Sequence, residues 1–184
     1  NLVEFWDGGA WRDLQSEEIP PINSQNFNVV IYTGTGSAQS ITGVGFKPDW
    51  VWIKQRNGTA WNSVFDSTRG VGKRIVTNSS NAENTDIQRL SSFDADGFSL
   101  GSDGDVNGSG KTFVAWCWKA NGGTTSSNTD GSITSTVQAN TKAGFSIVTY
   151  TGNLVAGASI GHGLGVKPSF IITKSTSNTE SWEV

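Results

Sequence analysis

The stretch that decides the fold is Gly45-Phe46-Lys47-Pro48-Asp49-Trp50-Val51-Trp52-Ile53-Lys54. Side chains of a strand point alternately to its two faces, so both Trp rings fall on one face and Val51 and Ile53 fall on the other. Because both faces are apolar, we expect a central strand that is covered on two sides. The run Thr112–Lys119 has the same alternation and predicts a second strand of this kind.

The chain also begins to repeat itself. Gly45–Lys54 returns as Gly165–Lys174, and Phe27–Gly34 returns as Phe145–Gly152. The repeated unit is about the size of one small domain. The second copy ends where the first is only part-built, so we expect this chain to be a piece of a longer modular protein.

The composition of the 184-residue chain suits short strands joined by polar turns: 35% of the residues are hydrophobic, 16% are charged and 23 are Gly. Glycine, with the frequent Ser, Thr and Asn, disfavours helices. The net charge of −3 argues against nucleic acid and anionic membrane surfaces as partners, because neither offers a counter-charge. No apolar run approaches the length of a bilayer span, so we expect no membrane insertion.

Four segments follow from this patterning: an N-terminal hairpin and linker (1–26), a β-sandwich repeat (27–120), a Gly/Ser/Thr/Asn-rich exposed linker and lead-in (121–143) and an incomplete second repeat (144–184). The one candidate for a helix is the short polar stretch Ala82–Leu90. We therefore predict an all-β fold, an antiparallel β-sandwich of the jelly-roll or lectin-like kind, with a short N-terminal hairpin and the start of a second copy.

The eight Trp residues raise the question of a sugar-binding face, since an exposed ring can stack on a pyranose. In the second copy, however, Phe170 and Ile172 stand where the first copy has Trp50 and Trp52. These replacements keep bulk without keeping a stacking ring, which indicates packing. We therefore assign Trp50 and Trp52, and the alternating Trp116 and Trp118, to the core.

Three other Trp residues are better candidates for ligand binding. Trp6 and Trp11 flank an Asp-Gly turn in the predicted N-terminal hairpin, where they can pair across the turn. Trp61, Arg56 and Asn57 follow the strand at 50–54 and complete our set of candidates. For the basic residues of these loops, which also include Arg69, Lys73 and Arg74, solvated turn positions are the simpler interpretation.

A turn with alternating oxygen-bearing side chains matches the opening of a calcium-binding loop. Asp103, Asp105 and Asn107 would be ligands, and Gly108 occupies the sixth position. The twelfth position should be a bidentate Glu and is Val114, inside a predicted strand. A polar hairpin is the simpler interpretation and a weak calcium site is the alternative; we expect no other cofactor.

Catalytic chemistry has little support in the sequence. Cys117 is the only cysteine and lies in an apolar strand, where we expect a buried thiol. His162 is the only histidine and has no titratable counterpart in the first copy. The pairs Asp94/Asp96 and Asp103/Asp105 could serve a glycosidase, but such spacing is common by chance in turn-rich segments. We therefore predict that the protein is not an enzyme.

Four segments together resemble a domain that is common in virion proteins of phages of aquatic bacteria: Gly45–Arg56, Phe65–Gly70, Phe93–Phe98 and Phe113–Ala120. The resemblance covers residues 27–120 fully and 145–184 as an incomplete copy. Residues 1–14 separately resemble Trp-Asp-Gly-x-x-Trp hairpins at joints of phage fibre proteins. The resemblance implies a β-rich, non-enzymatic virion component that is often oligomeric and contacts the host surface.

We therefore predict a bacteriophage virion structural protein of the tail, a fibre or a head appendage, which serves assembly and host-surface attachment. The expected partners are further copies of the chain, for example in a trimer, other virion proteins and glycans of the host surface. Many copies of a rigid sandwich would give weak contacts avidity. A carbohydrate-binding module of a secreted or surface protein is the alternative.

Overall fold

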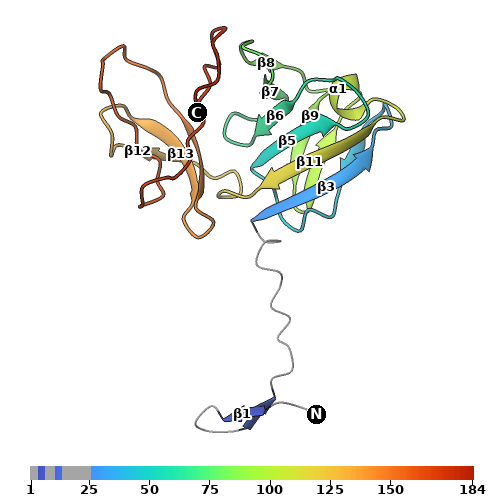
Figure 1. The fold of residues 1–184 in the computed structure, drawn as a ribbon, viewed down its shortest axis with the longest axis horizontal. Helices are drawn as coiled ribbons and strands as arrows, with labels where there is room; N and C mark the ends of the chain where they lie inside the picture. The colour runs from blue at the N-terminus through green and yellow to red at the C-terminus, as the bar shows by residue number, and fades with distance from the viewer. Residues whose placement is uncertain (1–3, 7–10, 14–25) are drawn as a thin grey trace.

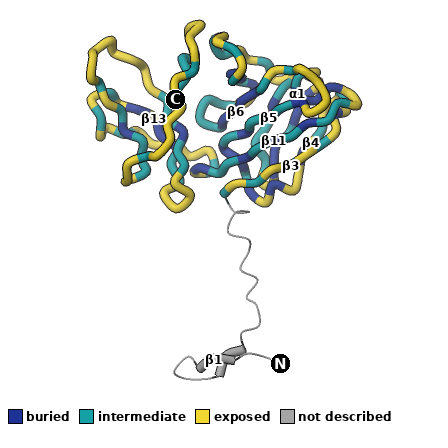
Figure 2. The backbone as a smooth tube through the Cα atoms, viewed as in Figure 1, coloured by how far each residue is buried: buried dark blue, intermediate teal, exposed yellow. Residues whose placement is uncertain are grey.

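The computed structural model describes residues 4–6, 11–13 and 26–184. A β-sandwich built from residues 26–123 lies beside a smaller unit built from residues 126–184 (Figure 1). The sandwich has a continuous buried interior, whereas most of the smaller unit is exposed or half-buried (Figure 2). All pairs of strands in the described ranges are antiparallel, which confirms the predicted all-β fold.

Six strands form the larger sheet of the sandwich, in the order β3-β11-β5-β6-β7-β8. Their bounds are β3 (Phe27–Thr33), β5 (Trp50–Gln55), β6 (Ser63–Asp66), β7 (Lys73–Val76), β8 (Asn84–Thr85) and β11 (Thr112–Trp118). The two apolar runs from which we predicted central strands are neighbours in this sheet, with Trp52 of β5 opposite Trp116 of β11. The sequence pattern thus located the middle of the sheet.

Three strands form the smaller sheet, in the order β4-β10-β9, with bounds β4 (Gln39–Ile41), β9 (Leu90–Asp94) and β10 (Gly97–Leu100). The core lies between the two sheets and takes buried side chains from both, among them Ile53, Phe65 and Phe113 of the larger sheet and Leu90, Phe98 and Leu100 of the smaller one. Burying each of these side chains contributes about 1.5–3 kcal/mol. The first copy therefore has a core of its own.

The short helix of the sandwich does not lie where we expected one. The helix that we considered at 82–90 is wrong, since this segment contains β8 and turns. Instead, α1 spans Gly104–Asn107. Asp103 is its N-cap, and the side chain of Asp103 accepts a hydrogen bond from the backbone N–H of Asp105 at 2.8 Å. This N-cap offsets the cost of starting a helix, and Val106 anchors the turn in the core.

A third sheet lies in the smaller unit, in the order β12-β13-β14, with bounds β12 (Ser126–Asn128), β13 (Ser135–Asn140) and β14 (Phe145–Thr149). β12 and β13 fall in the segment that we predicted as a linker; β12 is largely exposed, as expected, but its backbone is paired. β14 contains the sequence counterpart of β3. Within the described residues, the counterpart of β5 forms only an isolated bridge, between Thr173 and Glu183, which matches the Ile53–Ser63 pair of β5 and β6 in the first copy.

The N-terminal hairpin is confirmed at the level of its backbone. β1 (Glu4–Trp6) pairs with β2 (Trp11–Asp13), and Trp6 lies opposite Trp11. The turn between them, residues 7–10, and the side chains of both Trp residues lie outside the described residues. Their predicted role in ligand binding therefore stays a prediction.

Cys117 is fully buried in β11, as expected. Burial raises the pKa of its thiol from 9.0 to about 12, so we expect no labelling of the native chain by a thiol reagent at pH 8 and rapid labelling after unfolding. Because the pKa is higher in the folded state, the folded chain holds the thiol proton more tightly than the unfolded chain does. The stabilisation that results is complete below the pKa of the unfolded thiol and is lost as the pH rises toward 12. Fast labelling of the native chain would contradict this burial.

Candidate functional site

The face of the larger sheet that points away from the core carries an apolar surface, which we call the outer apolar face. It consists of Phe27, Val29 and Ile31 of β3, Trp50 and Trp52 of β5, and Trp116 and Trp118 of β11. Our assignment of these four Trp residues to the core was wrong. Val51 and Ile53 are the residues of β5 that enter the core, so the period of two places the rings on the opposite side, where they are half-buried.

The rings of this face pack on one another and on the second copy. Phe27 lies 4.8 Å from Trp118 between ring centroids, and Trp52 lies 5.6 Å from Trp116. Phe145 of β14, the sequence counterpart of Phe27, stacks on Trp118 at 6.2 Å and meets Trp50 at 6.5 Å. The second copy therefore covers part of the outer apolar face of the first.

The remainder of this face ends at an open edge. Among the described residues, β3 pairs only with β11. The bonds Gly34 N–H to Lys111 O and Lys119 N–H to Asn26 O show that the even-numbered residues of β3 face β11. The odd-numbered residues thus turn their backbone groups to the open edge while their side chains lie on the outer apolar face. Ile31 is 67% exposed there. An edge of this kind is a template for a further strand.

A pocket of about 80 Å³ lies at the other edge of the larger sheet, away from β3 and next to β7 and β8. Its walls are Trp61, Arg74, Val76, Asn81, Ala82 and Asn84. Of the three predicted ligand-binding residues whose side chains the structure describes, Trp61 lines this pocket, and its side chain is exposed, whereas Arg56 and Asn57 do not line it. Arg56 is also exposed, while the carboxamide oxygen of Asn57 accepts the Thr112 N–H at 3.1 Å and thereby holds its own loop.

The C-terminal segment of the chain runs along the residues that border this pocket. Trp182, the counterpart of Trp61, donates its indole N–H to the carbonyl of Val76 at 2.8 Å. Lys174 Nζ donates to the carbonyl of Ser80 at 3.1 Å, and burial lowers the pKa of this amine. These contacts tie the second unit to the sandwich at a second place, apart from Phe145.

The three residues that we considered as calcium ligands all have protein partners. Asp103 Oδ2 accepts from Arg89 at 3.1 Å, and Asp105 Oδ2 accepts from Arg74 at 2.7 Å. Asn107 is fully buried, and its carboxamide bonds four backbone and side-chain groups. A calcium ion would have to displace both arginines. The described part of the chain holds no group of three or more His, Cys, Asp or Glu that could hold a metal, and a weak calcium site stays a prediction.

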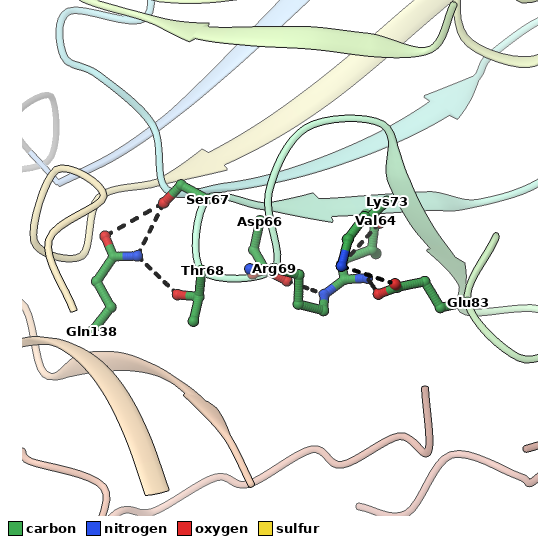
Figure 3. A network of polar contacts seen from close by, with 8 residues as sticks. All are labelled: Val64, Asp66, Ser67, Thr68, Arg69, Lys73, Glu83 and Gln138. Carbon is green, nitrogen blue, oxygen red and sulfur yellow. Dashed lines mark hydrogen bonds and ion pairs between the residues drawn. The ribbon is translucent and has the colours of Figure 1, made fainter. Parts of the chain in front are cut away.

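The sequence interpretation missed the buried ionic cluster that follows β6 (Figure 3). Arg69 donates to Asp66 at 2.5 Å and to Glu83 at 2.8 Å, and Lys73 lies 3.7 Å from Glu83. We had interpreted Arg69 as a solvated turn residue, yet its side chain is only 8% exposed. The fixed spacing of Asp66 and Arg69 was visible in the sequence, whereas the distant partner Glu83 was not.

Next to this cluster, a buried amide joins the second unit to the sandwich. Gln138 of β13 is fully buried and donates to the hydroxyls of Ser67 at 3.0 Å and Thr68 at 2.8 Å (Figure 3). Its carbonyl oxygen accepts the backbone N–H groups of Asn121 and Gly123. The loop after β6 thus positions both the ionic cluster and the second unit.

Comparison with known proteins gives one match. A family model for a domain of unknown function (DUF7483) matches residues 22–184, a range that includes the sandwich and the second unit. Neither the curated proteins nor the solved structures contain a match to this chain. Within the described residues, no helix has the length and apolarity needed to cross a membrane.

Proposed function

Since this chain belongs to the DUF7483 family through residues 22–184, whose description gives no activity, we propose that it is a non-enzymatic structural protein of the bacteriophage virion. It forms part of the tail, a fibre or a head appendage. It assembles through the outer apolar face, and its loops attach the particle to the host surface. Further copies of the chain and other virion proteins are its partners.

One observation carries the assembly part of this proposal: the second copy already packs on the outer apolar face of the first. Phe145 occupies only the Trp50–Trp118 end of that face. Val29 and Ile31, at the other end, remain exposed. Because contiguous exposed apolar surface usually marks an interaction site, we take a second copy of the chain as its partner. Residues from the same face would then serve contacts within and between chains.

The virion assignment rests on the four segments that resemble phage proteins, and in the structure these segments build the scaffold. They form β5 with its lead-in, the loop after β6, the β9–β10 hairpin and β11. In the hairpin, Asp96 accepts the backbone N–H groups of Gly43 and Gly45, and these bonds lower the pKa of its carboxyl. A scaffold role of this kind is what we expect of these segments in a structural protein.

Light scattering coupled to size-exclusion chromatography tests the assembly. We expect the chain to form oligomers and Ile31→Asp to shift it to monomer, because a charge buried in an apolar interface has no partner. Ile87→Asp is the matched control, since Ile87 is also exposed but lies outside the outer apolar face. A chain that is monomeric at every concentration, or equal effects of the two variants, would contradict the proposal.

The alternative is a carbohydrate-binding module of a secreted or surface protein, and the exposed ring of Trp61 beside Asn81 and Asn84 favours it. An aromatic ring that stacks on a sugar, with amides near its hydroxyls, is the arrangement such modules need. Glycan-array binding that is lost with Trp61→Ala, by a chain that stays monomeric, would favour this alternative over assembly.

A further inference from the structure

Arg74 of β7 is a buried cation with an incomplete set of partners. The residue is 7% exposed, so its guanidinium needs partners within the protein. Its Nη1 donates to Asp105 Oδ2 at 2.7 Å. Among the described residues, its buried Nε has no hydrogen-bond partner. Buried polar groups are nearly always paired, so an orphaned Nε at the wall of a pocket calls for an explanation.

The geometry of the guanidinium shows what is missing. The five N–H donors of Arg lie in one plane and form a fork that matches the two oxygens of a carboxylate. Asp105 accepts from Nη1, while Nε, on the neighbouring edge of the guanidinium plane, makes no hydrogen bond to any described residue. This free edge of Arg74 fits a second carboxylate, and none of the described residues in the pocket wall supplies one.

The other walls of the pocket add a ring and two amides. Trp61 is 39% exposed, and Asn84 lies opposite Arg74 in the register of β7 and β8. Asn84 Oδ1 accepts from Arg89 at 2.8 Å, which leaves the NH₂ group of Asn84 to donate elsewhere. The volume of about 80 Å³ holds about five water-sized groups, enough for an acidic substituent but not for a whole sugar ring.

We propose that this pocket binds a sugar that carries a carboxylate. The acid group pairs with the free edge of Arg74, the sugar ring lies against Trp61 outside the pocket, and the amides of Asn81 and Asn84 bond its hydroxyls. A neutral sugar leaves Nε of Arg74 without a partner, and a small inorganic anion does not use the ring. The site deepens the attachment part of the proposed function and does not depend on assembly through the outer apolar face.

Titration of the chain with methyl glucuronide, followed by tryptophan fluorescence and by NMR of the indole N–H groups, tests this site. We expect saturable binding, at least about tenfold weaker binding of the neutral methyl glucoside, and a similar loss of affinity in Arg74→Lys, which keeps the charge but not the fork. Acetate should bind more weakly than methyl glucuronide, because it has no ring to place against Trp61.

Two further variants keep the result interpretable. Trp61→Ala, at an exposed position, should also weaken binding about tenfold and tests the site even if Arg74→Lys does not fold. Lys142→Ala changes an exposed cation that is not in the pocket wall, and it should leave binding unchanged. Glucoside or acetate binding as tight as glucuronide binding, or full affinity in Trp61→Ala, would overturn the proposal while leaving the light-scattering result untouched.

Discussion

Arg69→Ala is expected to lower the free energy of unfolding by about 3–5 kcal/mol, because it leaves the buried carboxylate of Asp66 without its cation and takes the closer of two cations from Glu83. The side chain of Asp66 is 2% exposed and that of Glu83 is 16% exposed, and both accept hydrogen bonds from Arg69. Water cannot replace the guanidinium at Asp66. Urea unfolding followed by fluorescence measures the loss directly.

Lys73→Ala is the matched control for this prediction. Lys73 approaches the same carboxylate, Glu83, at 3.7 Å, but its side chain is 44% exposed. Exposed ion pairs contribute about 0–1 kcal/mol, so the control should change little. Similar losses in the two variants would mean that net charge near Glu83, and not the buried pairing with Arg69, stabilises the loop.

The loss of Arg69 should also affect the second unit. The loop that Arg69 holds carries Ser67 and Thr68, which accept hydrogen bonds from Gln138 of β13. If this loop loosens, the buried amide loses its partners and the second unit loses one of its attachments to the sandwich. Hydrogen exchange at the backbone of β13 should therefore speed up in Arg69→Ala and not in Lys73→Ala.

The strands could be predicted from the sequence because alternation is a local property. It identified β5 and β11 and the shared face of Trp50 and Trp52, but it could not tell which face the second sheet covers. That choice depends on Leu90, Phe98 and Leu100, which pack against Val51 and Ile53 from a different sheet. The exchange of Trp for Phe and Ile between the copies correctly indicated apolar packing. The same exchange is compatible with packing on an outer face and with packing in a core, so it could not distinguish the two.

The charged sites could not be predicted for a related reason. Arg69 and Arg74 are buried cations because Glu83 and Asp105 pair with them. These acidic partners are distant in the sequence, so no local sequence pattern around the arginines reveals the pairing. The pocket likewise combines the loop before β6, β7 and the loop before β8. Trp61 was selected by elimination, after the alternating Trp residues of the two strands had been assigned to packing.

Asp49→Ala is the second change with a large expected effect. Asp49 is fully buried, and its carboxylate accepts three hydrogen bonds, from Ser67 Oγ at 2.7 Å and from the backbone N–H groups of Ala120 at 2.7 Å and Gly122 at 2.8 Å. Alanine leaves these backbone donors unpaired in the turn that connects the sandwich to the second unit. We expect a loss of about 3–5 kcal/mol in urea unfolding, at about 1–3 kcal/mol for each buried donor left without a partner.

Asp49→Asn separates hydrogen bonding from bulk. Both backbone donors converge on Oδ2 and cannot turn, so the oxygen of Asn must take that position and its NH₂ group must face Ser67. The Ser67 hydroxyl can rotate to accept this new donor, so we expect Asn to lose less than half of what Ala loses. Hydrogen exchange at the Ala120 and Gly122 amides should accelerate in the Ala variant and stay slow in the Asn variant. If Asn is as damaging as Ala, the negative charge itself, and not its acceptor geometry, holds the turn between the two copies.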